Sequence, residues 1–165
     1  MHKNNERLNE IKLVGITTRT NNAHLFEASP ETNVVAATVQ KYFHQGLAKN
    51  ILHRKKPGTT YCAYTEYESD VNGDFTYFIG EEVDSFNNVP EGFKTLTIPP
   101  QNYLKLTNSP GPMPEVCINS WKNVWQMSPQ QLGGQRAYQT DFELYDERAA
   151  DHKNVVLDLY IGLKP

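Results

Sequence analysis

The chain has 165 residues, of which 38% are hydrophobic and 21% charged, so it can bury one sizeable core in a single domain spanning 1–165. Its formal net charge of −3 provides no overall field that would attract nucleic acid or an anionic membrane. The sequence contains neither a signal peptide nor an apolar run of about 18 residues, so we expect a cytoplasmic protein.

The first half of the chain is predicted to contain a strand, a helix and a hairpin. Residues 11–20 are rich in β-branched side chains, which favours a strand. A helix should begin after Ser29-Pro30-Glu31 and continue to about Asn50, because apolar residues then recur at helical spacing. The segments 59–67 and 74–83 flank a turn-like ESDVNG sequence and are therefore expected to pair as a β-hairpin.

The second half repeats this order. Residues 93–109 hold an extended segment, and PGPMPE then opens a helix that carries Trp121 and Trp125. A Gly-Gly pair ends that region, and strands are predicted within 137–147 and 154–163.

The two halves also share short stretches of similar sequence. The sequence EYESD…GDFTYFIG can be laid over LYDER…NVVLDLYIG, which places Tyr67 over Tyr145, Phe78 over Tyr160 and Gly80 over Gly162. We therefore predict an α+β fold of two βαββ pseudo-repeats, about 8–85 and 92–165. The predicted product is a curved, six-stranded antiparallel sheet with both helices on one face.

Side-chain alternation gives a hypothesis for the two faces of this sheet. An apolar row in the last strand should face the helices, together with Phe75, Tyr77 and Ile79 of the first half; the row comprises Val155, Leu157, Leu159, Ile161 and Leu163. If Phe142 and Leu144 also face the helices, Glu143 and Tyr145 join Tyr160 and Phe78 on the uncovered face. That face would then be an aromatic groove with one acid.

Several patterns that suggest other chemistry are rejected. Asp70, Asn72, Asp74 and Glu81 fit positions 1, 3, 5 and 12 of a calcium loop, but Phe75 stands where that loop needs glycine. The five histidines lack ligand spacing, and Cys62 and Cys117 form no CxxC pair. No metal or cofactor is therefore expected, and the cysteines are expected to be buried free thiols.

Some residues allow two interpretations at this point. Trp121 and Trp125 lie one helical turn apart, and such a pair serves either the core or a pocket; Tyr64 is a similar case. Glu143 is either a solvated acid on an open sheet face or an acid buried among aromatic rings.

The tandem order, the W-x-x-x-W helix, DFELYDE and the terminal VVLDLYIGLKP together resemble the GyrI-like effector-binding domain. This domain is also the ligand-sensing half of AraC-type and MerR-type transcription regulators. The resemblance spans nearly the whole chain and extends to small stand-alone members encoded on mobile gene cassettes. The helix-turn-helix domain of the regulators has no counterpart in these residues, so direct contact with nucleic acid is not expected.

The resemblance implies a groove for lipophilic, often cationic, small molecules, as in multidrug binding. A glutamate on the strand before the last lies at the bottom of that groove, and by motif it is Glu143. The full set of expected ligand-binding residues is Glu143, Tyr160, Trp125, Phe78, Tyr145, Trp121 and Tyr64.

Two other functions compete with passive binding. Some relatives of this fold are similar to hydrolases of electrophilic compounds, in which Glu143 would be the general base and Tyr145 or Tyr160 the donor. A gyrase-inhibitor-like role, with gyrase or a transcription regulator as protein partner, is the third reading.

Overall fold

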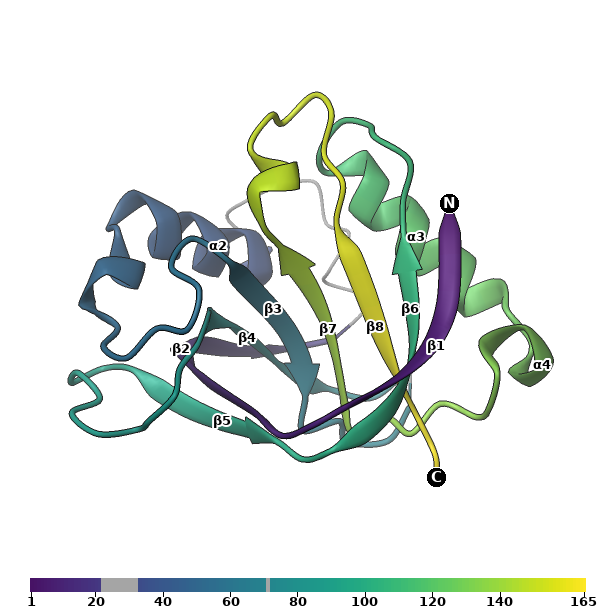
Figure 1. The fold of residues 1–165 in the computed structure, drawn as a ribbon, viewed down its shortest axis with the longest axis horizontal. Helices are drawn as coiled ribbons and strands as arrows, with labels where there is room; N and C mark the ends of the chain where they lie inside the picture. Colours follow the sequence, from purple (N-terminus) through teal and green to yellow (C-terminus); the bar gives the residue numbers. More distant parts are fainter. Residues whose placement is uncertain (22–32, 71) are drawn as a thin grey trace.

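The computed structural model describes residues 1–21, 33–70 and 72–165, which form a curved sheet with helices packed behind it (Figure 1). Within these residues the sheet has eight strands, all paired antiparallel, in the order β1-β6-β8-β7-β3-β4-β2-β5. The strands are β1 His2–Leu8, β2 Ile11–Thr20, β3 Thr60–Thr65, β4 Phe75–Glu82, β5 Lys94–Ile98, β6 Gln101–Thr107, β7 Thr140–Tyr145 and β8 Asp158–Leu163. The helices are α2 Val34–His44, α3 Glu115–Gln126 and α4 Pro129–Leu132, with 3-10 turns η1 Leu47–Asn50 and η2 Glu147–Ala149.

The predicted α+β class is confirmed, as are strand β2 and the β3–β4 hairpin. The Asn33 side chain caps α2 by accepting from the Ala36 N–H at 3.1 Å; the predicted cap at 29–31 lies outside the described residues. The helix ends at His44 rather than near Asn50, because Gly46 adopts a left-handed conformation with φ 58° and starts the separate turn η1.

The predicted number of strands was too small. The polar N-terminus forms β1, which has no apolar alternation to reveal it, since most of its side chains are exposed. The extended segment 93–109 is two strands, β5 and β6, separated by Pro99-Pro100. Proline lacks the N–H that a sheet ladder needs, so the strand is interrupted there.

The four outer strands tie the two halves of the chain together. Strand β1 pairs with β6 and β2 pairs with β5 in one continuous register, from His2 opposite Thr107 to Gly15 opposite Lys94. The resulting two-stranded ribbon bends along the lower margin of the sheet in Figure 1. Each half therefore gives its first strand to the other half. Duplication of one unit, with repeats at about 8–85 and 92–165, stays a prediction.

Both faces of the sheet carry a hydrophobic core. The helix-side core lies under α2 and α3 and includes Tyr42, Trp121 and Val124 from the helices. The second core fills the opposite side of the sheet and consists of Ile11, Leu13, Tyr61, Ala63, Phe78, Ile98, Tyr103, Phe142 and Tyr160, with Leu8, Leu96 and Leu144 at its margin. Ile11, Ile98 and their neighbours come from the bent ribbon, which thus helps to close this side.

This second core overturns part of the predicted face assignment. The apolar row of β8 and Phe75, Tyr77 and Ile79 do face the helices, as expected. Phe142 and Leu144 do not, because Phe142 lies opposite Tyr160 in the β7–β8 register and both belong to the second core. Glu143 and Tyr145 therefore point toward the helices, since neighbouring strand residues face opposite sides.

Two glycines allow β2 and β4 to approach closely. Gly15 and Gly80 face each other in the antiparallel ladder. A Cβ atom built on Gly80 would collide with the backbone carbonyl of Val14, and one on Gly15 with that of Ile79. Backbone atoms cannot rotate away as a flexible side chain can, so these positions require glycine.

We expect Gly80→Ala to lower the free energy of unfolding by about 1–3 kcal/mol, because β2 and β4 must separate to admit the methyl group. Urea unfolding followed by circular dichroism measures this loss. Gly134→Ala is the matched control, since its Cβ would meet Leu163 only at an ordinary 3.7 Å. Equal stability of the two variants would contradict the packing argument.

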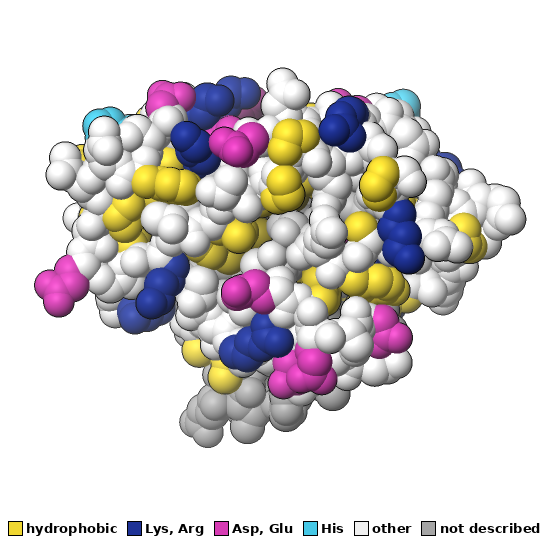
Figure 2. All heavy atoms as spheres, turned by 90° about the horizontal axis from the view of Figure 1, so that it is seen from below, with side chains coloured by type: hydrophobic (Ala, Val, Ile, Leu, Met, Phe, Trp, Pro, Cys, Tyr) yellow, Lys and Arg dark blue, Asp and Glu magenta, His cyan; other side chains and the backbone are white. Residues whose placement is uncertain are grey.

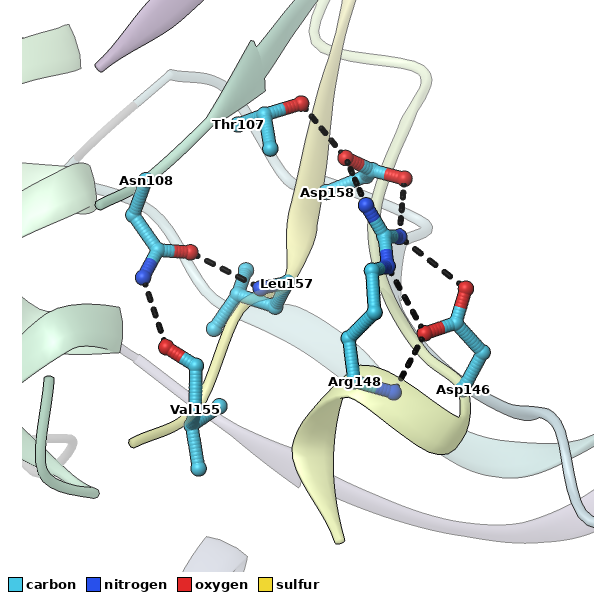
Figure 3. A network of polar contacts seen from close by, with 7 residues as sticks. All are labelled: Thr107, Asn108, Asp146, Arg148, Val155, Leu157 and Asp158. Carbon is cyan, nitrogen blue, oxygen red and sulfur yellow. Dashed lines mark hydrogen bonds and ion pairs between the residues drawn. The ribbon is translucent and has the colours of Figure 1, made fainter. Parts of the chain in front are cut away.

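An ionic network holds the β7–β8 connection against the sheet (Figure 3). Arg148 joins Asp158 at 2.6 Å and Asp146 at 2.9 Å, and the Thr107 hydroxyl donates to Asp158 at 2.6 Å. Asn108 donates to the Val155 carbonyl and accepts from the Leu157 N–H. Burial alone would raise the pKa of the Asp146 carboxyl, but the hydrogen bonds and charge of Arg148 hold it below its usual value.

This lowered pKa gives a pH-dependent contribution to stability. A carboxyl whose folded pKa is depressed stabilises the fold above its unfolded pKa of about 3.9, and the contribution is lost as pH falls through the folded value. Arg148→Gln should therefore cost up to about 1 kcal/mol at pH 7, and the difference from wild type should shrink toward pH 3. Urea unfolding at both pH values measures it. The exposed Arg7, whose Nη1 lies 3.2 Å from the Asn102 side chain, provides the control variant Arg7→Gln, for which no such pH dependence is expected. A difference that grows on acidification would contradict the assignment.

Candidate ligand-binding site

Glu143 lies in the middle of β7, near the centre of the sheet. Its neighbours across the ladders are Cys62 on β3 and Leu159 on β8. Its side chain is 2% exposed and points into the helix-side core beneath α3. The alternation of Thr140–Tyr145 puts Phe142 in the second core, so the same strand buries an aromatic ring on one side and an acid on the other.

Three neutral donors surround the Glu143 carboxylate. The Tyr64 hydroxyl and the Trp121 indole N–H both donate to Oε2, at 2.6 and 2.7 Å. The Tyr145 hydroxyl donates to Oε1 at 2.6 Å. The distances are typical of donors on a carboxylate, and each oxygen has at least one partner. The cage draws on β3, β7 and α3, so both halves of the chain build it.

The cage satisfies the hydrogen bonds of the carboxylate without supplying a positive charge. Four carboxylates are buried in the described residues: Glu81, Asp141, Glu143 and Asp158. The other three have an arginine partner each, and Glu143 alone among them has none in the part of the chain that the structure describes. A buried acid with neutral donors keeps its affinity for a cation, because the hydrogen bonds do not cancel its charge.

The Glu143 site changes the acidity of the groups around it. Burial, and then the Glu143 charge, raise the pKa of the Tyr64 and Tyr145 phenols well above the ordinary value. The same two causes raise the pKa of the Cys117 and Cys62 thiols. The phenols therefore remain hydrogen-bond donors at neutral pH, and both thiols remain protonated.

A second polar cluster is centred on Asp141, two residues before Glu143 on β7. Asp141 is fully buried and accepts hydrogen bonds from the Gly162 N–H at 2.7 Å and the Tyr67 hydroxyl at 2.6 Å. It also forms an ion pair with Arg136 at 2.8 Å. Sequence reasoning missed this cluster, although the spacing of Asp141 and Glu143 places both acids on one face of the strand.

Arg136 connects the two clusters. Its guanidinium carbon lies 4.3 Å from the centre of the Tyr138 ring and 5.9 Å from that of the Trp121 ring. Trp121 in turn donates its N–H to Glu143. The one indole therefore touches the paired cation with its ring and the unpaired anion with its nitrogen.

The structure divides the seven predicted site residues between the two sides of the sheet. Glu143, Tyr64, Trp121 and Tyr145 meet in one hydrogen-bonded cage, and the half-buried Trp125 lies 6.4 Å from Trp121, ring centre to ring centre. Phe78 and Tyr160 lie in the second core instead, where Tyr160 stacks on Phe142 at 4.6 Å. The predicted groove that put Glu143 and Tyr145 on the same face as Tyr160 and Phe78 is wrong, because the face assignment of β7 was shifted by one residue.

A surface cavity of about 290 Å³ opens on the side of the second core. It is lined by Lys56, Thr59, Tyr61, Glu82, Leu144, Asp146 and Glu147. None of the predicted ligand-binding residues is among them. Two of its acids already have partners, since Glu82 lies 3.6 Å from Lys55 and Asp146 binds Arg148.

The face of the molecule seen in Figure 2 carries charges of both signs. In the view of Figure 2, basic and acidic side chains alternate with small apolar groups, and no broad patch of one sign forms. Within the described ranges, no group of three His, Cys, Asp or Glu residues could hold a metal ion. No helix in those ranges is long and apolar enough to cross a membrane.

Comparison with known proteins gives relatives over nearly the full length. YobU of Bacillus subtilis (strain 168), described as a proposed transcriptional regulator, is 26% identical over 153 residues, which is 93% of this chain and 92% of YobU. An integron cassette protein from the mobile metagenome of Vibrio cholerae has a TM-score of 0.77 and 26% identity, covering 98% of this chain and 95% of that one.

A third relative was solved with a ligand. SAV2435 bound to tetraphenylphosphonium has a TM-score of 0.77 and 17% identity, covering 99% of this chain and 94% of that one. At this identity the likeness concerns the fold. The model of the family described as Cass2, integron-associated effector binding protein, matches residues 6–163. This chain therefore belongs to the Cass2 family of integron-associated effector-binding proteins.

Proposed function

We propose that this chain is a binding protein for a small lipophilic cation, which it senses or sequesters at Glu143. One observation carries the proposal: Glu143 is 2% exposed, has three neutral hydrogen-bond donors, and has no basic partner in the described residues. A cation placed beside it gains from an electrostatic interaction in a site that water screens poorly.

The walls of the site suit a lipophilic cation. Tyr64 and Trp121 pack edge to face at 4.9 Å, and Trp125 extends the aromatic surface along α3. Aromatic faces add apolar area and a cation–π attraction of about 0.5–2 kcal/mol per well-placed ring. Flat or delocalised cations are therefore favoured over small hydrated ions.

A ligand reaches Glu143 only when a covering side chain moves, since so little of the acid is exposed. We expect Trp121 and Tyr145 to be the covering side chains that move, because Trp121 belongs to α3 and Tyr145 is the last residue of β7. Binding should then weaken or replace a hydrogen bond of the cage, in a shift between two packed arrangements.

The relatives also support the proposed binding function. The family as a whole is described as effector binding, and SAV2435 was solved with tetraphenylphosphonium, a lipophilic cation. YobU is described in terms of transcription, which supports a role near gene regulation, with a regulator as partner. A gyrase-type partner has no comparable support among the described residues.

We favour binding over hydrolysis on chemical grounds. The hydrolytic alternative needs Glu143 with Tyr145 or Tyr160 as proton donor. Tyr160 lies in the second core, on the other side of the sheet from Glu143. Burial and the Glu143 charge raise the pKa of Tyr145 well above its usual value, so it holds its proton and is a poor general acid.

We expect wild-type protein to bind tetraphenylphosphonium and Glu143→Gln to bind it about tenfold more weakly or worse, because the amide keeps the shape of the site and removes its charge. Isothermal titration calorimetry gives both affinities, and quenching of the combined fluorescence of Trp121 and Trp125 provides an independent signal. Neutral triphenylphosphine oxide should not distinguish the two proteins.

The control variant is Glu82→Gln, which removes a carboxylate from the cavity on the opposite side. It should leave the affinity unchanged. If Glu82→Gln abolished binding while Glu143→Gln did not, the ligand would occupy the opposite cavity and the Glu143 proposal would be wrong.

A further inference from the structure

The helix-side core contains two acids on one strand with different partners. Asp141 and Glu143 are both buried and lie on the same face of β7, so their Cα atoms are about 7 Å apart. One guanidinium, that of Arg136, is buried beside them, with its side chain 9% exposed. It pairs with Asp141 at 2.8 Å and lies against the ring of Trp121, whose N–H binds Glu143.

Asp141 is the carboxylate that pairs with the Arg136 guanidinium. Its Nη2 lies on Asp141 Oδ2, while its Nε is buried with no hydrogen-bond partner among the described residues. The rings of Tyr138 and Trp121 provide faces for the guanidinium but no carboxylate oxygen. Without the Asp141 charge, the nearest buried anion on this face of the strand is Glu143.

We propose that Asp141 is a specificity-determining residue, which holds Arg136 away from Glu143 and so keeps Glu143 free for an external cation. This inference rests on the proposed function of Glu143. Asp141 touches no ligand in this scheme and acts through Arg136, as a positioning residue. The Asp141–Arg136 pair is neutral as a unit, so the net charge of the site remains that of Glu143.

The proposal predicts opposite effects on the affinity for a cation when either member of the Asp141–Arg136 ion pair is substituted. Asp141→Asn keeps an oxygen for the Gly162 N–H and keeps the shape of the side chain, but leaves Arg136 as an unpaired cation near Glu143. It should weaken tetraphenylphosphonium binding about tenfold. Arg136→Met keeps the packing against Tyr138 and Trp121 and removes the competing cation, so it should bind the probe at least as tightly as wild type.

The double variant completes the test. Asp141→Asn with Arg136→Met restores a neutral pair and should return the affinity to within about threefold of wild type. A merely structural role for the ion pair predicts instead that all three variants bind more weakly. Neutral triphenylphosphine oxide should bind wild type and Asp141→Asn equally, because these two proteins differ in the charge of one side chain and not in its shape.

Calorimetry on the 165-residue proteins with tetraphenylphosphonium separates the outcomes. Wild-type affinity in Asp141→Asn, or a double variant as weak as Asp141→Asn, would overturn the inference while leaving Glu143 in place. If Asp141→Asn does not fold, Arg136→Met alone decides, since weaker binding by that variant contradicts the scheme. If wild type fails to bind the probe, the proposed function is wrong.

A ligand-free measurement tests the positioning step separately. The indole N–H resonance of Trp121, assigned with Trp125→Phe, reports its hydrogen bond to Glu143. In Asp141→Asn it should move toward its position in Glu143→Gln, because freed Arg136 competes for the carboxylate, and it should return in the double variant. An unmoved resonance in Asp141→Asn would show that Arg136 stays away from Glu143 without Asp141.

Discussion

Burial of the sheet on both faces is the constraint on which the rest of the structure depends. The helices cover one face, and the bent ribbon of β1–β2 against β5–β6 helps to enclose aromatic rings on the other. Because each half of the chain supplies strands to the other half, neither core can form from one half alone. The central pairing of β3 with β7 then lies between two apolar layers, and any charge placed there is screened poorly by water.

The buried acids of the chain differ in the groups that pair with them. Asp141 is neutralised by Arg136, and Asp158 by Arg148 at the end of the sheet. Glu143 has neutral donors, among them two phenols and an indole, and no basic partner in the described residues. Stability alone would favour an apolar residue at such a position, because burying an unpaired charge is costly. A residue that is kept in spite of such a free-energy cost is typical of a functional site.

The sequence was sufficient for the fold class, because β-branched runs, helical spacing and turn residues each act locally. β2 and the β3–β4 hairpin appear where predicted. The site was harder to predict. The alternation of apolar and polar side chains shows which face of a strand points to the core only when the other face is exposed to solvent. In TDFELY both faces are buried, so Phe142 could not tell which side Glu143 takes. The β7–β8 register decides that question, and it depends on contacts distant in sequence. The polar strand β1 was invisible for the opposite reason, since it buries almost nothing.

The central β3–β7 pairing also has a consequence for stoichiometry. Ala63 lies opposite Phe142 across this seam, and these two residues pair outward with Phe78 and Tyr160 respectively. On each side of this seam the strands follow in a matching order, and Tyr64 and Glu143 hold matching positions, one residue after Ala63 and Phe142. These counterparts hydrogen-bond to each other, one as donor and one as acceptor. The architecture offers two equivalent positions but places a carboxylate at one of them. Under the proposed function, each chain therefore saturates with a single monovalent cation, because the matching position holds a phenol instead of a carboxylate.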